Sequence, residues 1–322
     1  MSKFDVVALG ELLIDFTLNG VSTQGNSMFE ANPGGAPCNV LSMLQKLGKK
    51  TAFVGKVGND QFGRLLRETI EEVGIDSTYL LNDKEIPTTL AFVHTFPDGD
   101  REFSFYRKPG ADMMLCEDEI KEEMVNDTKI FHFGTLSMTH EGVKKATIKA
   151  INLAKKNGAI ISLDPNLREP LWDNLEHAKE AMLEAISYCD VLKISDNEIQ
   201  FLTGIEDYDE GINTLRRMYD IPLVCLTMGK DGSRAYYKDL RIEMPGFKQE
   251  NVLDTTGAGD TFCASVLGFV CDNGLDNLDA DKLKEMLTRA NAAASLVTLK
   301  RGAIKSMPSV DEVNELISTR GL

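Results

Sequence analysis

The sequence predicts an α/β protein with a doubly wound, mostly parallel sheet, helices on both faces and a small β-sheet lid. Three observations support this fold class. Short apolar runs alternate along the chain with longer segments of helical period. These apolar runs are continuous, as expected of strands buried on both faces. Two further segments, with the character of antiparallel strands, interrupt the alternation.

The first half of the chain is expected to begin with strand 4–10, helix 38–48, strand 51–58 and helix 60–74. Asp60 is a suitable residue to cap the last of these helices, and Gly74 to close it. Further buried strands are expected over 129–134, 159–164, 191–195 and 222–229, with helices between them, including one over 141–157. The last third is predicted to be mostly helical, over 258–274, 280–300 and 309–319.

The two interrupting segments are residues 12–20 and 88–107. The second contains a hairpin turn signal at Pro97, Asp98 and Gly99. A hairpin inserted in an α/β chain is typical of a lid over a cleft. We therefore expect a lid made of residues 12–36 and 88–108, and a nucleotide-binding core made of residues 1–11, 37–87 and 109–322.

The composition argues against several classes of partner. The chain has 322 residues and a formal net charge of -15, so nucleic acid and anionic membranes are not expected to bind it. It has no basic segment ahead of a long apolar stretch, and no run of 18 apolar residues, so neither a signal peptide nor a membrane span is expected. The six cysteines form no CxxC pair, as in a cytoplasmic protein with reduced thiols.

The stretch DTTGAGDTF, residues 254–262, is the strongest candidate for chemistry. It precedes an apolar helix whose buried start exposes unpaired N–H groups and a partial positive charge. Gly257 and Gly259 allow a ligand to approach this backbone, as at a phosphate site. Asp260, in the first turn, would then be the base that takes a proton from an attacking hydroxyl. A capping role for Asp260 would leave both glycines unexplained.

A second glycine-rich turn, NPGGAPCNV at residues 32–40, also leads into a helix. It combines close backbone approach with the side-chain amide of Asn39, which can bind hydroxyls. Asp15, among apolar neighbours, could accept hydrogen bonds from a polyol. Other nucleotide motifs are absent: GNDQFGRL at 58–65 lacks the Lys-Ser/Thr of a P-loop, and no GxGxxG follows the first strand.

Together, GGAPCN at 34–39 and DTTGAGD at 254–260 resemble the two signatures of the ribokinase-like (PfkB) carbohydrate kinases. The resemblance extends over almost the whole chain. It implies ATP as phosphoryl donor, Mg²⁺, and K⁺ as an activator. It also implies that Asp260 is the catalytic base, with Gly257, Ala258 and Gly259 forming an anion hole. The residues implied to bind sugar hydroxyls are Asp15, Gly34, Gly35 and Asn39.

The resemblance also implies a nucleotide site and a cation site. KISDNEIQFLTG at 193–204 is similar to the family's Asn-x-x-Glu region, with Ser195 at the Asn position and Glu198 acting on Mg²⁺ through water. The other implied nucleotide-binding residues are Lys193, Thr227, Gly229, Gly232 and Asn291. The implied K⁺ site consists mostly of backbone oxygens, at Asp254, Thr256, Val297, Lys300, Gly302 and Ser306.

The choice of sugar depends on two short segments. FSFYRKPGADMML (103–115) and DPNLREPLW (164–172) resemble the fructokinase branch. They supply Phe105, Arg107 and Arg168 as further substrate-binding candidates. The main alternative is 2-keto-3-deoxygluconate kinase, which shares both arginines but tends to carry a tyrosine where this chain has Phe105. Without that hydroxyl a substrate carboxylate would be under-coordinated, which favours a neutral sugar, most of all fructose.

Three other interpretations stay open: a ribokinase, a nucleoside kinase of the same fold, and a non-catalytic sugar sensor. The intact Asp260 and its glycines argue against the sensor. Arg107 and the polar segment 164–168 argue against a nucleoside. An exposed lid edge could pair with a second copy, so we expect a homodimer formed through the lid.

Overall fold

A computed structural model describes residues 2–95 and 101–319 of the chain. Within these residues the large sheet has nine strands. Their order across the sheet is β13 (Leu240–Met244), β12 (Ser233–Tyr237), β11 (Leu223–Thr227), β10 (Val191–Ser195), β9 (Ile160–Leu163), β8 (Thr128–Phe133), β1 (Phe4–Leu9), β4 (Thr51–Gly58) and β5 (Leu80–Asp83). The strands from β11 to β5 run parallel, whereas β12 and β13 are antiparallel additions at one edge.

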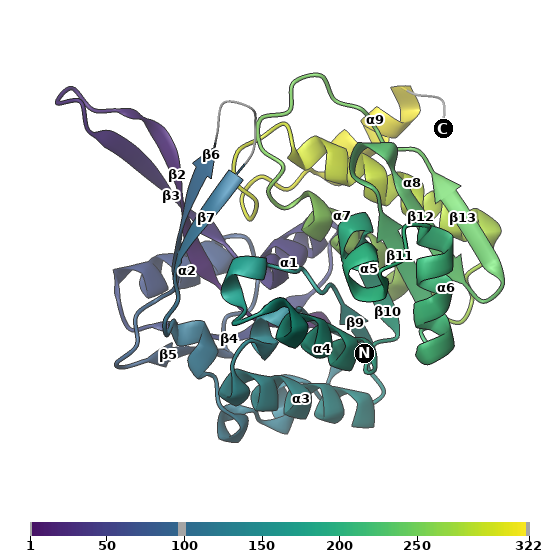
Figure 1. Ribbon diagram of the computed structural model, residues 1–322, viewed down its shortest axis with the longest axis horizontal. Helices are drawn as coiled ribbons and strands as arrows, with labels where there is room; N and C mark the ends of the chain where they lie inside the picture. The colour runs from purple at the N-terminus through teal and green to yellow at the C-terminus, as the bar shows by residue number, and fades with distance from the viewer. Residues whose placement is uncertain (1, 96–100, 320–322) are drawn as a thin grey trace.

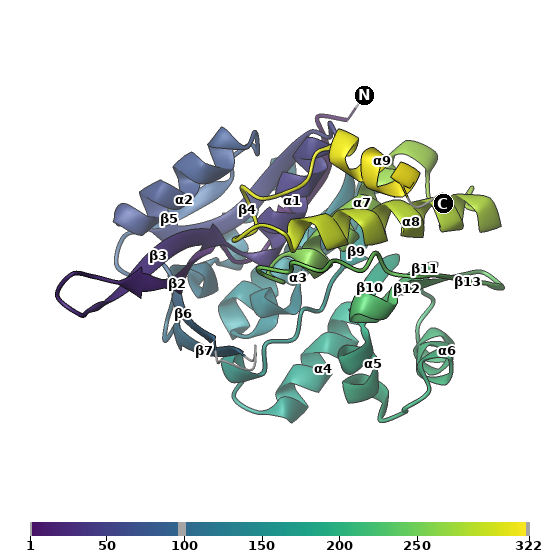
Figure 2. The same ribbon diagram turned by 90° about the horizontal axis from the view of Figure 1, so that it is seen from above.

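Helices cover both faces of this sheet (Figures 1 and 2), which confirms the predicted fold class. One face carries α1 (Ala36–Lys46), α2 (Gln61–Glu72), α7 (Ala258–Asn273), α8 (Ala280–Val297) and α9 (Val310–Thr319). The other carries α3 (Glu141–Lys156), α4 (Leu175–Ile186), α5 (Asp196–Thr203) and α6 (Tyr208–Met218).

The continuous apolar strands are explained by these two helical layers. Successive side chains of a strand point to opposite faces, so a strand between two layers buries every residue. In β1, Val6 and Ala8 pack in the core of the first face, whereas Val7 and Leu9 pack in the core of the second. Those four side chains are fully buried.

The lid is a separate four-stranded sheet in the order β3 (Ser27–Gly34), β2 (Leu13–Val21), β6 (Leu90–Thr95) and β7 (Arg101–Tyr106). It projects from one side of the core (Figure 1). The pairs β2–β3 and β6–β7 are antiparallel, but β2 and β6 pair in parallel, which the sequence did not indicate. Both β2 and β6 follow parallel strands of the core, β1 and β5, and so leave it in the same direction. The turn predicted at Pro97, Asp98 and Gly99 lies outside the described residues.

Two expectations from the sequence concern the cysteines and membrane-spanning segments. The cysteines, which are all among the described residues, form no disulfide. Within residues 2–95 and 101–319, none of the helices is long and apolar enough to cross a membrane.

Candidate active site

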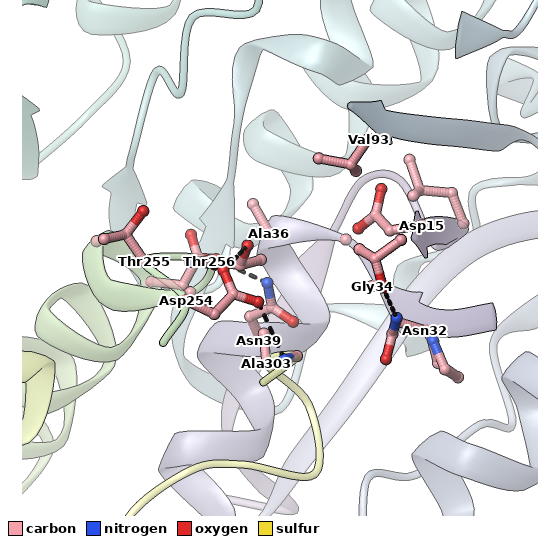
Figure 3. A pocket seen from close by; sticks show the side chains of 18 of the residues that line it. Asp15, Asn32, Gly34, Ala36, Asn39, Val93, Asp254, Thr255, Thr256 and Ala303 are labelled. Carbon is pink, nitrogen blue, oxygen red and sulfur yellow. Dashed lines mark hydrogen bonds between the residues drawn. The ribbon is translucent and has the colours of Figure 1, made fainter. Parts of the chain in front are cut away.

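A cavity of about 630 Å³ lies between the lid and the edge of the large sheet where the parallel strands end. This is the edge at which open α/β sheets bind their ligands. The lid contributes Asp15, Asn32, Val93 and Phe105, and the core contributes Glu11, Asn39, Asn166, Arg168, Lys193 and Asp260. Figure 3 shows the side chains of Asp15 and Val93 on one side of the cavity and those of Asp254 to Thr256 on the other.

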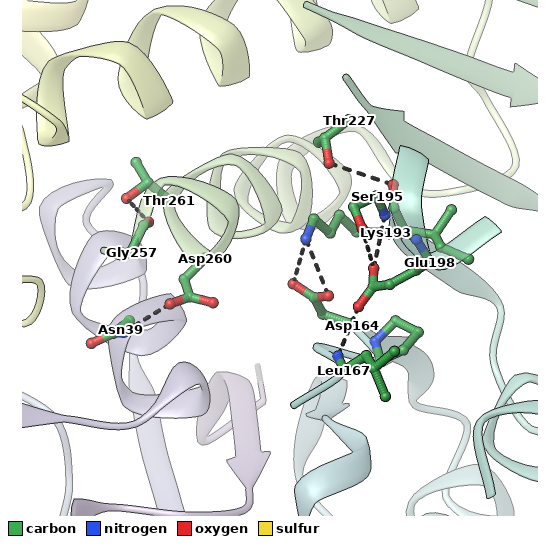
Figure 4. A network of polar contacts seen from close by, with 12 residues as sticks. Asn39, Asp164, Leu167, Lys193, Ser195, Glu198, Thr227, Gly257, Asp260 and Thr261 are labelled. Carbon is green, nitrogen blue, oxygen red and sulfur yellow. Dashed lines mark hydrogen bonds and ion pairs between the residues drawn. The ribbon is translucent and has the colours of Figure 1, made fainter. Parts of the chain in front are cut away.

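Asp260 lies in the first turn of α7, and its side chain is directed toward Asn39 of α1 (Figure 4). The Nδ2 of Asn39 donates to Oδ2 of Asp260 at 2.7 Å. Asp260 is only 8% exposed. Burial raises the pKa of Asp260, while the Asn39 bond and the positive charges of Lys193 and Arg168 limit that rise. Asp260 is therefore a buried carboxyl at the cavity with a strengthened affinity for a proton, as a general base requires.

The start of α7 has the form expected of an anion site. Gly257 is its N-cap, in the left-handed conformation with φ 80°, and none of the described side chains caps the helix. The first helical hydrogen bond runs from Thr261 N–H to Gly257 O at 2.8 Å. The N–H of Ala258 is already directed to Thr255 O, at 3.3 Å. Gly257 and Gly259 both line the cavity, where their backbone is close to a bound ligand.

Both glycines also have a packing reason that the sequence could not reveal. A Cβ on Gly257 would lie 2.8 Å from the Cβ of Ala303, and one on Gly259 would lie 3.0 Å from Nζ of Lys193. The C-terminal loop and the lysine therefore approach the start of α7 only because side chains are absent there.

Lys193 of β10 brings a buried cation to this helix start. Its Nζ lies 3.0 Å from Oδ2 of Asp164. Burial alone lowers the pKa of a lysine, but Asp164 and Glu198 raise the pKa of Lys193 above its ordinary value, so its ammonium stays charged. Figure 4 shows the Lys193–Asp164 pair beside the Asp260–Asn39 pair. The site thus holds a positive charge next to the proposed base.

Glu198 is held by the backbone around it. Its Oε2 accepts from Ser195 N at 2.8 Å and from Ser195 Oγ at 2.9 Å, while Oε1 accepts from Leu167 N at 2.8 Å. Ser195 is the N-cap of α5 in a capping box with Glu198, which gives this serine a structural role. Burial favours protonation of Glu198, but Lys193 and these hydrogen bonds outweigh it and lower its pKa.

The remaining residues expected on the nucleotide side lie outside the cavity lining. Thr227 ends β11, and Gly229 and Gly232 follow it at φ 54° and 109°. A Cβ on Gly232 would lie 2.2 Å from Met244 O, so this position requires glycine. Asn291 of α8 donates to Met244 O and Pro245 O, both at 3.2 Å. These residues gather around the β11–β13 edge, next to the Lys193 end of the site.

On the sugar side, Asp15, Gly34, Gly35 and Asn39 all line the cavity, as expected. A Cβ on Gly34 would lie 2.6 Å from Oδ2 of Asp15, and one on Gly35 would lie 2.4 Å from Glu11 O. Burial raises the pKa of Asp15 to about 7; Arg168 opposes this shift and Asp254 adds to it. The glycine pair thus lets the Asp15 carboxylate and the β1–β2 connection approach the start of α1.

Glu11 is a site residue that the sequence reasoning missed, although it directly follows Gly10 in the GELLIDF stretch. It is 5% exposed, and its Oε1 accepts from Ala36 N at 2.8 Å. Gly35 caps α1 without a side chain, and so Glu11 supplies the missing cap from 25 residues earlier. Asn32 and Asn166, the latter at φ 53°, are further lining residues without a clear signal in the sequence.

Arg107 differs from the expectation for a substrate ligand. It lies outside the cavity lining and is 4% exposed. Its guanidinium donates to Asp112, Thr139 Oγ1 and Leu136 O at 2.8–3.0 Å. The sequence could not reveal this because Leu136 and Thr139 lie 29 and 32 positions further along the chain and reach Arg107 only through tertiary packing. Phe105 and Arg168, in contrast, do line the cavity, and Arg168 is exposed.

Asp254 connects the two loops that are expected to form the K⁺ site. Its Oδ1 accepts from Thr256 N at 2.9 Å and Thr256 Oγ1 at 2.7 Å, and its Oδ2 accepts from Gly302 N at 3.2 Å. Of the other expected positions, Val297 O accepts from Lys300 N at 3.2 Å and Ser306 Oγ donates to Arg301 O at 2.6 Å. Over the described parts of the chain, no three His, Cys, Asp or Glu side chains are grouped so as to hold a metal ion.

Comparisons with known proteins identify the family of the chain. A family model described as pfkB family carbohydrate kinase matches residues 3–310. The chain belongs to this family. This chain is also 40% identical over 314 residues to fructokinase-1 of Zea mays, and the match covers 97% of each sequence. It is therefore an ATP-dependent carbohydrate kinase.

Solved structures of two fructokinases superpose on the chain closely. A fructokinase from Xylella fastidiosa with bound ATP gives a TM-score of 0.91 at 29% identity, covering 99% of each chain. A double mutant of the fructokinase from Vibrio cholerae, with fructose, ADP and a potassium ion bound, gives a TM-score of 0.87 at 28% identity, covering 98% of this chain and 99% of the other.

Proposed function

We propose that this carbohydrate kinase is a fructokinase, which transfers the terminal phosphoryl group of ATP to the terminal hydroxyl of fructose and gives fructose 6-phosphate. The observation that carries the proposal is the buried Asp260, held by Asn39 at the start of α7 and lining a cavity under the lid. The choice of fructose is supported by the similarity to the fructokinases of Zea mays and Xylella fastidiosa.

In this proposal Asp260 takes the proton of the attacking hydroxyl, because it is the buried carboxyl at the helix start. The backbone of Gly257, Ala258 and Gly259 stabilises the negative charge that moves with the phosphoryl group, assisted by the nearby ammonium of Lys193. Asp15 accepts hydrogen bonds from sugar hydroxyls, together with the cavity-lining backbone of Gly34 and Gly35. Closure of the lid would exclude water from the transfer.

ATP and Mg²⁺ are expected at the other end of the site, where the nucleotide-binding candidates are Lys193, Thr227, Gly229, Gly232 and Asn291. Mg²⁺ keeps several of its waters in such sites and is held by few carboxylates together with substrate phosphates. The residues present fit this mode. Both carboxylate oxygens of Glu198 already accept hydrogen bonds from the protein, so Glu198 would contact Mg²⁺ through one of the waters of the ion. Mg²⁺ would supply charge neutralisation for the transferring group.

A K⁺ ion is the second expected metal, supported by the potassium ion in the Vibrio cholerae fructokinase structure. Asp254 joins the loop before α7 to the loop at Gly302, so a cation bound between their carbonyls would order both. The candidate positions are Asp254, Thr256, Val297, Lys300, Gly302 and Ser306. Activity in K⁺ compared with Na⁺ or Tris buffers would test this activation.

The acid substrate 2-keto-3-deoxygluconate is the second candidate, since Arg168 lines the cavity. The other arginine expected to hold a carboxylate, Arg107, lies outside the cavity lining and is held by Asp112, Thr139 and Leu136. That arrangement favours a neutral sugar.

The test is ADP production by the purified protein with ATP, Mg²⁺ and K⁺, with fructose, 2-keto-3-deoxygluconate, ribose and adenosine compared side by side. Dominant turnover of fructose supports the proposal. Dominant turnover of the acid, the pentose or the nucleoside would reject fructose and leave the kinase chemistry in place. Binding without turnover of any of them would instead support a sugar sensor.

A homodimer through the lid is a further part of the proposal. Large apolar side chains are exposed along the lid strands, with Leu18 56%, Val21 63%, Phe29 40% and Tyr106 66% exposed. Exposed apolar side chains gathered on one sheet are typical of an interaction surface. Light scattering after size-exclusion chromatography should give a dimer, which Val21→Asp should convert to monomer. A cytoplasmic location also stays a prediction, testable by cell fractionation.

A further inference from the structure

Asp112 and Arg107 form a buried ion pair directly behind the cavity wall. Arg107 follows β7, and Asp112 lies in the short 3-10 helix Ala111–Met114; each is 4% exposed. Oδ2 of Asp112 accepts from Nε of Arg107 at 2.8 Å and lies 2.7 Å from its Nη2. Such a two-point contact fixes the plane of the guanidinium as well as its charge.

Both partners are held in place by other polar groups. Oδ1 of Asp112 accepts from Thr89 Oγ1 at 2.5 Å. Arg107 also donates from Nη1 to Thr139 Oγ1 at 2.8 Å and from Nη2 to Leu136 O at 3.0 Å. The arginine therefore has a partner at each of its three nitrogens and cannot turn to the cavity without losing them.

The pair nevertheless lies close enough to the cavity to affect its charge. Leu136, whose carbonyl Arg107 binds, lines the cavity, and so does Glu11. Burial raises the pKa of Glu11 to about 7; the Asp112 charge adds to this rise and the Arg107 charge opposes it, so both charges reach the cavity wall.

The charge of the cavity depends on this neutralisation. Among the described residues that line it, the carboxylates are Glu11, Asp15, Asp254 and Asp260, and the cations are Arg168, Lys193 and Arg301. The lining therefore has one more carboxylate than cation, and because Arg107 is neutralised by Asp112 it does not cancel this negative charge. Without Asp112, a buried unpaired guanidinium behind Leu136 and Glu11 would attract an anion strongly, because charges interact over longer range in a low-dielectric interior.

We propose that Asp112 is a specificity-determining residue, which makes the site select a neutral sugar over a sugar acid by pairing with Arg107. This inference rests on the proposed function, since it explains why a site with Arg168 and Arg301 in its lining and Arg107 behind it takes fructose. Asp112 acts through Arg107 and the wall, and touches no substrate itself.

The test is Asp112→Asn, which keeps the side-chain shape and removes the charge. We expect the ratio of kcat/KM for fructose to that for 2-keto-3-deoxygluconate to fall at least ~10-fold, corresponding to unmasking of one charge near the cavity. Asp112→Glu, which retains the charge, should keep this ratio within about 3-fold of that of the original protein. A ratio that stays unchanged in Asp112→Asn would overturn the proposal.

A matched control distinguishes an effect of charge on selectivity from an effect of greater lid mobility. Asp60 holds the segment that leads into β6 of the lid, since its carboxylate accepts from Thr88 N and Thr88 Oγ1, both at 2.8 Å. Among the described side chains, Asp60 has no arginine partner. Asp60→Asn should leave the ratio within about 3-fold. An equal fall in Asp60→Asn would mean that mobility, and not charge, sets the selectivity, and would also overturn the proposal.

Two further measurements test the proposal if the Asp112→Asn variant does not fold or if the protein does not phosphorylate fructose. If Asp112→Asn does not fold, the double variant Arg107→Met/Asp112→Leu is measured instead. Removing both charges should keep the ratio of the original protein. A fall of about 10-fold would contradict the claim that Asp112 acts by neutralising Arg107. If the original protein does not phosphorylate fructose, the proposed function fails by itself. Calorimetric titration of 2-keto-3-deoxygluconate then tests the charge effect alone, and equal affinity for the original protein and the folded variant rejects it.

Discussion

The hydrogen bond between Asn39 and Asp260 allows a quantitative prediction for Asn39→Leu. Asn39 is 4% exposed and donates at 2.7 Å to a carboxylate that is 8% exposed. A hydrogen bond to a charged group contributes about 1.5–3 kcal/mol. This bond stabilises the ionised form of Asp260, so its loss must raise the pKa of Asp260 further. At 1.36 kcal/mol for each pKa unit, the expected rise is about 1–2 units.

The assay is kcat/KM for fructose as a function of pH at saturating ATP, because its acid limb reports the base of the free enzyme. The limb should move to higher pH by about 1–2 units in Asn39→Leu. Loss of sugar contacts by Asn39 would lower the whole profile without moving the limb. Ser42→Ala is the matched control, since Ser42 is buried on the same helix but donates to Ile304 O. An acid limb that stays in place in Asn39→Leu, or moves equally in Ser42→Ala, would refute the reasoning.

Three shorter predictions follow from the same site. Asp260→Asn should lower kcat by about 10²–10⁴-fold while the melting temperature is kept, and near-normal turnover would remove Asp260 as the base. Gly34→Ala places a Cβ 2.6 Å from Oδ2 of Asp15, so KM for fructose should rise about 10-fold or more with KM for ATP unchanged; equal effects on both would contradict a local displacement. Asp15, whose pKa is raised to about 7, binds its proton more tightly when folded, so its contribution to stability is lost as pH rises from about 4 through 7. Asp15→Asn should therefore raise the melting temperature more at pH 8 than at pH 5, where only part of this contribution is lost, and an equal gain at both pH values would contradict this shift.

Local patterns were sufficient to predict most of the fold. The continuous apolar runs predicted strands covered on both faces, and β1 buries Val6 and Val7 in opposite cores. The sequence did not indicate the antiparallel pair β12–β13. The edge strand β13 alternates half-exposed and exposed residues, and β12, although mostly buried, begins with Ser233 and Arg234 and so has no continuous apolar run. The parallel pairing of β2 with β6 joins segments more than 70 residues apart, and no short-range pattern encodes it.

The sequence by itself determined the chemistry at the start of α7, because glycine, alanine, glycine and aspartate occur there as neighbours and act together through local backbone geometry. It also determined the sugar-side turn at Gly34 and Gly35 for the same reason. Only the tertiary structure decided the partners of each charge. Asn39 meets Asp260 across 221 positions, Lys193 meets Asp164 across 29, and Arg107 turns to Leu136, also across 29 positions, behind the cavity wall. The effect of a buried charged group on its surroundings depends on the group that neutralises it. That partner is set by packing between segments that are far apart in the sequence.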